Sequence, residues 1–166
     1  MNNKIFKYSS FDVVVKYVLD NLGATLNHTN MTSRTSEMLA REFELLREIR
    51  PKEKCMCYHI VFSIGYRQAE HHLGGCNLHL SDYDYYRLAR RYLEQMGFLG
   101  GDGIHKSQYL IARTTGVDEE DLHIIVSRVR MDGTIVSDYL EQQRNNFVVN
   151  RLNQEFEIEN CLLIGY

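Results

Sequence analysis

The sequence predicts an α+β domain in which a mostly antiparallel sheet of about five strands is covered by helices. The chain has 166 residues, and at that length a single domain over residues 1–166 is expected. Strand-like and helix-like segments mix without the steady alternation of strand, helix and strand that is typical of a parallel sheet. Neighbouring strand-like segments near residues 108–136 indicate antiparallel pairing instead.

The N-terminal third is expected to form two strands around a helix. Residues 4–8 alternate apolar and polar side chains, which predicts a strand. Residues 11–20 then place apolar side chains at a helical period, with Ser10 as the expected N-cap and Gly23 as the stop. Residues 24–31 are a possible second strand.

The middle of the chain predicts a helix, a strand and a second helix. The first helix begins at a cap on Thr35 or Ser36 and runs to Arg50, where Pro51 ends it. Residues 55–64 alternate well enough for a strand. A further helix is expected from Ser81 to Met96, with Gly97 as its stop. In the strand, one face is expected to hold Met56, Tyr58, Ile60 and Phe62, and the other Cys57, His59, Val61 and Ser63.

The C-terminal third predicts two strands, a short hairpin arm and a last helix. The strands are expected over residues 108–112 and 122–129. An Asp-Gly turn signal then lets residues 134–136 fold back as a short arm. The last helix is expected over about 138–156, and residues 65–80, which are rich in glycine and histidine, are expected to form a loop.

Composition excludes several classes of protein. Apolar residues make up 44% of the chain and aromatic residues 11%, which supplies a core and argues against disorder. No apolar run reaches the ~18–20 residues of a membrane-spanning helix. The N-terminus also lacks the pattern of a secretory signal, so a cytoplasmic protein with reduced cysteines is expected. The net charge of -3 means that any contact with nucleic acid needs a local basic face.

Tyr17, near the end of the first predicted helix, is the first candidate for chemistry. A phenol can act as a nucleophile when a neighbouring base or metal activates it. On spacing alone, the simpler interpretation is a tyrosine that is exposed on the helix surface or half-buried.

Acidic residues and a histidine on the strand near residue 122 form the second candidate. Asp121 and His123 are two residues apart, so their side chains leave the same face, and Glu119 continues the row if the strand begins early. Two carboxylates and an imidazole are reasonable ligands for a hard divalent cation. The alternative is an acidic turn that leads into a strand whose histidine faces solvent. His59, on the strand 55–64, is expected to be a structural or hydrogen-bonded histidine.

Basic side chains near tyrosines form the third candidate. Arginines interleaved with aromatic residues suit single-stranded nucleic acid, which they bind by phosphate contact and base stacking. The alternative is a set of solvated helix surfaces. The arginines expected to contact DNA are Arg34, Arg113, Arg128 and Arg130.

Several segments, taken in order along nearly the whole chain, point to a known family. They are residues 11–19, 30–35, 39–43, 50–51, 58–63, 92–98 and 123–138. In this order they resemble the relaxase or mobilisation-nuclease family, the HUH-type endonucleases of plasmid transfer. The first segment is similar to the helix that carries the family's nucleophilic tyrosine, which would be Tyr17. The last segment is similar to the family's metal-binding strand and the turn after it.

The metal-binding motif departs from the family pattern, which is histidine-x-aspartate and then, four residues on, histidine-x-histidine. In register with His123, the other three positions hold Thr114, Gly116 and Asp121. His123 is therefore the only imidazole that remains in the motif. If the family's divalent metal, Mg²⁺ or Mn²⁺, binds here, its expected ligands are Asp121, His123 and Glu119.

The resemblance implies two functions of different classes. In the first, Tyr17 attacks a phosphodiester of single-stranded DNA at a transfer origin, with accessory mobilisation proteins as possible partners. The products would be a 5'-phosphotyrosyl link and a free 3'-hydroxyl. In the second, a catalytically weakened relative binds single-stranded DNA or a partner protein. The tyrosine favours the first function, and Thr114, Gly116 and Asp121 favour the second. An unrelated structural α+β domain is the third interpretation.

Overall fold

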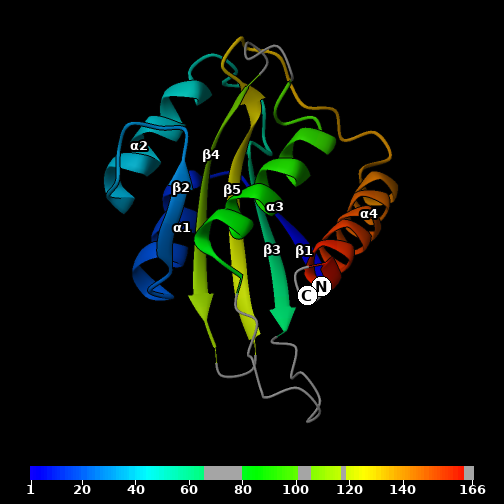
Figure 1. Cartoon of the computed structure of the whole chain (residues 1–166). Coiled ribbons are helices and arrows are strands. Elements are labelled where there is room, and N and C mark those ends of the chain that lie inside the picture. Colours follow the sequence, from blue (N-terminus) through cyan, green and yellow to red (C-terminus); the bar gives the residue numbers. More distant parts are fainter. Residues whose placement is uncertain (66–79, 101–105, 117–118, 163–166) are drawn as a thin grey trace.

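Five strands form one antiparallel sheet in the computed structural model, which describes residues 1–65, 80–100, 106–116 and 119–162. The strands are ordered β1-β3-β5-β4-β2 (Figure 1), so β1 and β2 are the edges. All neighbouring pairs are antiparallel, which confirms the predicted α+β class. The strands are β1 (Asn2–Tyr8), β2 (Thr25–Thr29), β3 (Cys57–Gly65), β4 (Ser107–Thr115) and β5 (Glu119–Arg130).

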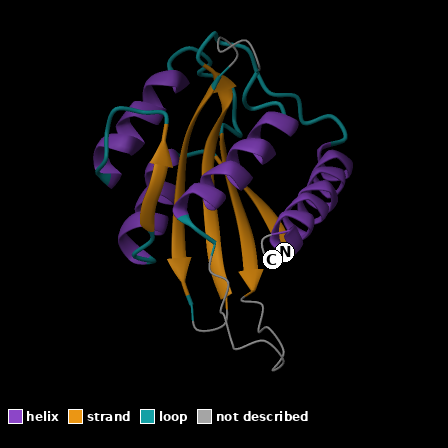
Figure 2. Cartoon of the chain, viewed as in Figure 1, coloured by secondary structure: helices purple, strands orange, loops and turns teal. Residues whose placement is uncertain are grey.

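Helices cover both faces of the sheet, as Figure 2 shows. Side chains of α1 and α2 pack against one face, and side chains of α3 and α4 pack against the other. Of these helices, none in the described part of the chain has the length and apolar character needed to cross a membrane. The helical elements are α1 (Phe11–Lys16), the π-helical turn η1 (Tyr17–Asn21), α2 (Ser36–Arg47), α3 (Asp82–Gln95) and α4 (Glu141–Leu162).

Strand alternation divides the apolar side chains between two cores. In β3, Tyr58, Ile60 and Phe62 lie in the core under α3 and α4, which confirms the face predicted for them. Met56 was expected on the same face but belongs to the core under α1 and α2. It precedes the strand, so the alternation of β3 does not yet apply to it.

The element boundaries differ from the sequence predictions at a few points. Ser81 forms a capping box with Asp84, as its position at the start of α3 suggests. The last helix begins at Glu141 instead of 138, because Leu140 has a φ of 51° and cannot be part of a right-handed helix. The short arm is present as an antiparallel bridge between Val129 and Ile135. The loop expected over 65–80 lies, apart from its two ends, outside the described residues.

Candidate active site

A pocket of about 510 Å³ lies on the α1/α2 face of the sheet. Tyr17 lines it from η1, and Asp121 and His123 line it from β5. The structure therefore places the predicted nucleophile in the same pocket as two of the three predicted metal ligands, although they are far apart in the sequence. The pocket's other lining residues are Phe6, Tyr8, Leu22, His59, Val61 and Thr114.

Tyr17 reaches this pocket because of how its helix packs. The buried side of the helix carries Phe11, Val14, Val15 and Val18, which leaves the intervening Tyr17 on the outer side with 48% of its surface exposed. At this residue the α-helix becomes a π-helical turn, in which the Leu22 N–H donates to the Tyr17 carbonyl at 2.9 Å. Such turns occur often at functional sites.

Two buried histidines form the floor of the pocket. His59 Nε2 and His123 Nδ1 are 3.1 Å apart, and the two rings are stacked. Each histidine is only 4% exposed. Burial lowers the pKa of His59 to about 4, and the neighbouring His123 adds to this effect. Burial also lowers the pKa of His123, although Asp121 opposes that shift. Both imidazoles are therefore neutral at physiological pH, and their lowered pKa values make them weaker proton acceptors than an exposed histidine.

The remaining polar groups around His123 are already hydrogen-bonded. Thr114 lies directly opposite Asp121 in the β4/β5 register, and its hydroxyl is 3.3 Å from His123 Nε2. Ser63 donates a hydrogen bond of 2.6 Å to Asp121 Oδ1. Glu119 begins β5 on the same face, as the sequence suggested, but it is exposed and does not line the pocket.

These side chains do not fit the three-imidazole metal site of the family pattern. Both ring nitrogens of His123 have hydrogen-bonding partners, and the β4 residue within 3.3 Å of its Nε2 is Thr114 instead of a histidine. At Gly116, the family's aspartate position, a Cβ would lie 2.8 Å from the Glu119 carbonyl oxygen, so a side chain requires a backbone shift. Within the described residues, no three histidine, cysteine or acidic side chains gather as a metal site.

The four arginines predicted to contact DNA lie away from the pocket and have partners within the protein. Arg34 donates to backbone carbonyls of its own loop. Arg113 pairs with Asp82 at 3.1 Å and lies over the ring of Tyr85, under α3. Their DNA-binding role stays a prediction.

The other two arginines hold the end of β5. Arg128 is paired with Glu53 at 3.0 Å and with Asp138 at 3.1 Å. Arg130 donates a hydrogen bond of 2.6 Å to the Gly97 carbonyl. The structure therefore supports a structural role for both arginines. Arg128 fixes the segments that contain Glu53 and Asp138, and Arg130 fixes the turn at Gly97.

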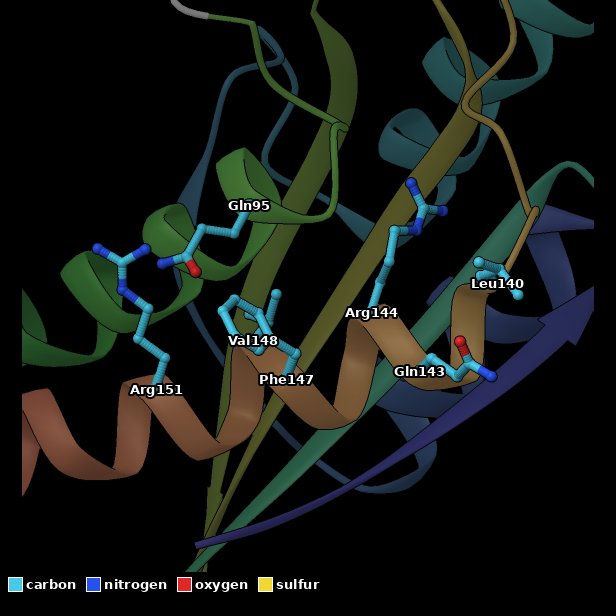
Figure 3. Close-up of a pocket in the computed structure, with 7 residues that line it drawn as sticks. All are labelled: Gln95, Leu140, Gln143, Arg144, Phe147, Val148 and Arg151. Atoms are coloured by element: carbon cyan, nitrogen blue, oxygen red, sulfur yellow. The ribbon is translucent and has the colours of Figure 1, made fainter.

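A second hollow lies between α3 and α4, on the opposite face of the sheet (Figure 3). Its lining includes the exposed ring of Phe147 and the guanidinium groups of Arg144 and Arg151. Arg151 pairs with Glu155 at 3.0 Å, and Arg144 donates to the Ser137 carbonyl. Because this hollow holds no nucleophile beside a base, we do not assign it a role in catalysis.

Sequence reasoning missed two aromatic residues of the candidate site, Phe6 and Tyr8, and selected His59 without linking it to His123. The alternation in residues 4–8 predicts the strand, and the two-residue spacing puts both rings on one face. It does not say which strand lies beside β1. Only the pairing of β1 with β3, which sets Phe6 opposite His59, brings these rings to the pocket.

Comparison with known families identifies one family for this chain. The model of the relaxase family, described as the MobA/VirD2-like nuclease domain, matches residues 17–158. The matched range begins at Tyr17 and includes every strand of the pocket except β1. Neither the curated proteins nor the solved structures give a match to this chain. Because the match covers most of the chain, this protein belongs to the relaxase family of MobA/VirD2-like nuclease domains.

Proposed function

We propose that this domain nicks single-stranded DNA through Tyr17, at a plasmid transfer origin in the cytoplasm. Membership of the relaxase family supports a DNA-nicking role and a single-stranded DNA partner. The observation that carries the proposal is the shared pocket, which a half-exposed phenol lines together with two neutral imidazoles and a carboxylate. Accessory mobilisation proteins are the further partners that we propose.

The proposed reaction is a transesterification. The Tyr17 hydroxyl oxygen attacks the phosphorus, the bond from phosphorus to the 3'-oxygen breaks, and the phosphate stays joined to tyrosine and to the 5' side of the next nucleotide. The phenol proton leaves to a base, and the departing 3'-oxygen takes up a proton. Because a tyrosine has a pKa of about 10, a nearby base is needed at neutral pH. The pocket holds Asp121, His59 and His123 as candidate proton acceptors, and we propose that one of them takes the proton although burial lowers the pKa of both histidines.

A divalent metal is generally used by relaxases of this family. The sequence-based hypothesis places Mg²⁺ or Mn²⁺ on Asp121, His123 and Glu119. Only the first two of these line the pocket, and both already have hydrogen-bonding partners there. We therefore write the reaction without a metal and propose that metal dependence is weak in this member.

A covalent-trapping experiment tests the proposal. A single-stranded DNA pool of randomised sequence, labelled at its 3' end, is incubated with the protein with and without Mn²⁺ and then run on a denaturing gel. We expect a labelled protein adduct that Tyr17→Phe abolishes and Tyr8→Phe, a matched change in the same pocket, retains. An adduct that persists in Tyr17→Phe overturns the assignment of the nucleophile.

A catalytically weakened DNA-binding protein is the second candidate. It is favoured by the loss of imidazoles at Thr114 and Asp121 and by the hydrogen bonds that occupy both nitrogens of His123. In that case the wild-type protein and Tyr17→Phe bind the DNA pool equally well, and neither forms an adduct.

A further inference from the structure

One face of β1 carries a row of exposed side chains that leads to the candidate active site. Phe6 is 42% exposed and Tyr8 is 36% exposed, and both line the pocket that contains Tyr17. Lys4, also exposed, precedes them at the same two-residue spacing and lies opposite Val61, another pocket residue. We call these three residues, Lys4, Phe6 and Tyr8, the β1 row.

The β1 row is exposed because of the way in which the helices cover the sheet. The core under α1 and α2 contains side chains of β3, β4 and β5 but none of β1. The alternate residues of β1 face α4 instead, where Asn3 bonds Asn145 and Lys7 pairs with Glu141. β1 is therefore held firmly from one side, while its other side presents two aromatic rings to solvent.

The rings of the β1 row are supported from beneath. The Phe6 and Tyr8 rings lie 5.9 and 6.4 Å from the His59 ring, both tilted against it. Residues two apart on a strand are separated by about 6.6 Å, so the rings form successive steps along one surface. Exposed aromatic steps on a sheet are a known means of binding single-stranded nucleic acid, because every base has a face that can stack.

We propose that the β1 row is a stacking platform that holds the bases of single-stranded DNA next to the nucleotide that Tyr17 attacks, with Lys4 at a phosphate. The proposal rests on the proposed function for its substrate class but not for its chemistry. Two observations select DNA as the occupant: the platform is continuous with the Tyr17 pocket, and its cation suits a phosphate. β1 lies outside the residues that match the family, so the platform is a feature of this chain and not of the family match.

Equilibrium binding of a fluorescent oligothymidylate of about 20 nucleotides tests the platform. All variants are made in the Tyr17→Phe background, which separates binding from covalent chemistry. We expect Phe6→Ala and Tyr8→Ala each to weaken binding about 10-fold, and Phe6→Trp to restore it, because stacking on one aromatic ring contributes that much. Tyr139→Ala removes an even more exposed ring far along the chain and should leave the affinity unchanged.

The salt dependence of the same titration separates stacking from charge. Lys4→Gln should reduce the slope of log affinity against log salt by about 0.7, as expected for one lost contact to single-stranded DNA. Phe6→Ala should leave that slope unchanged. Unaltered affinity in both alanine variants overturns the platform, and so does a change in oligomeric state in place of DNA affinity, which would mark a protein interface. If the wild type forms no adduct but the alanine variants lose affinity, the nicking proposal fails and the platform stands.

Discussion

The two faces of the sheet use tyrosine in opposite ways. Under α3 and α4, the rings of Tyr85 and Tyr92 are fully buried and their hydroxyls donate to Glu120 and Asn145. Burial raises the pKa of Tyr92 well above its ordinary range. On the other face, Tyr17 is half-exposed beside neutral imidazoles.

The two faces differ in how completely helices cover them, and not in the type of residue that they carry. Helices α3 and α4 cover one face, which we call the closed face, so a buried phenol there is shielded from substrate and kept protonated. On the α1/α2 face, which we call the open face, the core contains no side chain of β1, and Tyr17 is half-exposed in the same pocket as His59 and His123. The presence of eleven tyrosines in the sequence therefore says little about function until it is known which of them are buried.

The largest effect is expected from matched changes of one residue type on the two faces. Phe62, on the closed face, is fully buried and packs edge-on against Tyr92 at 5.0 Å. Phe62→Ala should reduce the free energy of unfolding by about 3–5 kcal/mol because it leaves a cavity. Phe6→Ala, on the open face, should change it by less than about 0.5 kcal/mol. Urea denaturation measures both changes. Equal losses of unfolding free energy would mean that Phe6 on β1 is packed as tightly as Phe62 on β3.

A second test restores the family's imidazoles on the open face. Thr114 and Asp121 are directly opposite each other, so histidines at both positions would point to the same side as His123. We expect the double variant Thr114→His with Asp121→His to bind Mn²⁺ and to gain about 2.7 kcal/mol of stability at a metal concentration 100 times its Kd. The wild type should gain much less.

The control for this test is the double alanine variant at the same two positions, which keeps the loss of Thr114 and Asp121 but adds no imidazole. It should show no response to the metal in thermal unfolding. A wild-type response as large as that of the double histidine variant would show that Asp121 and His123 bind the ion without help, contrary to our interpretation of the donor set.

Local patterns in the sequence predicted most elements of the fold, and the reasons are physical. The alternation in β3 and the helical period of α1 follow from burial on one side of each element, and both are visible within ten residues. The start of α4 was missed because the residue with positive φ there is Leu140 and not a glycine, which would have signalled it. No local signal marks such a residue.

The candidate site was only partly predictable. Tyr17, Asp121 and His123 could be selected because their neighbours along the chain carry the family resemblance. His59 was expected to be structural, and its place beside His123 follows from the pairing of β3 with β5. Arg113 and Arg128 looked available for DNA because they have acidic partners that are distant in sequence: Glu53, for example, pairs with Arg128 from 75 residues away. Strand order and ion pairing are tertiary properties that single-sequence patterns do not contain.

The buried histidines should make stability depend on pH. His59 has its pKa lowered to about 4 in the folded protein, whereas the unfolded chain has the ordinary value of about 6.5. The unfolded state therefore binds more protons between these values, so stability falls as the pH drops from about 6.5 to 4 and is unaffected by His59 above that window. We expect His59→Gln to flatten the profile by about 2 kcal/mol over this window. Urea denaturation at a series of pH values measures it, and parallel profiles for both proteins would show that His59 has the same pKa in the folded and unfolded states.

The smallest effect is expected where the two faces meet at β1. Asn145, on α4, is buried and bonds both the Tyr92 hydroxyl at 2.8 Å and the side chain of Asn3 at 2.8 and 3.0 Å. Asn145→Ala leaves the Tyr92 hydroxyl without its partner and should cost about 1–2 kcal/mol of stability. The exposed Asn146 provides a matched control, since Asn146→Ala touches neither β1 nor Tyr92.

This change also tests whether the open face depends on the closed one. Asn3 belongs to β1, so losing its bond to Asn145 loosens the strand that carries the β1 row from the side opposite the rings. If the platform works because β1 is held rigid, Asn145→Ala should weaken oligothymidylate binding by about two- to three-fold, less than removing a ring, since rigid rings lose less freedom on binding. An affinity equal to that of Asn146→Ala would mean that β1 is positioned by its pairing with β3 alone, and that the closed face contributes stability without shaping the DNA site.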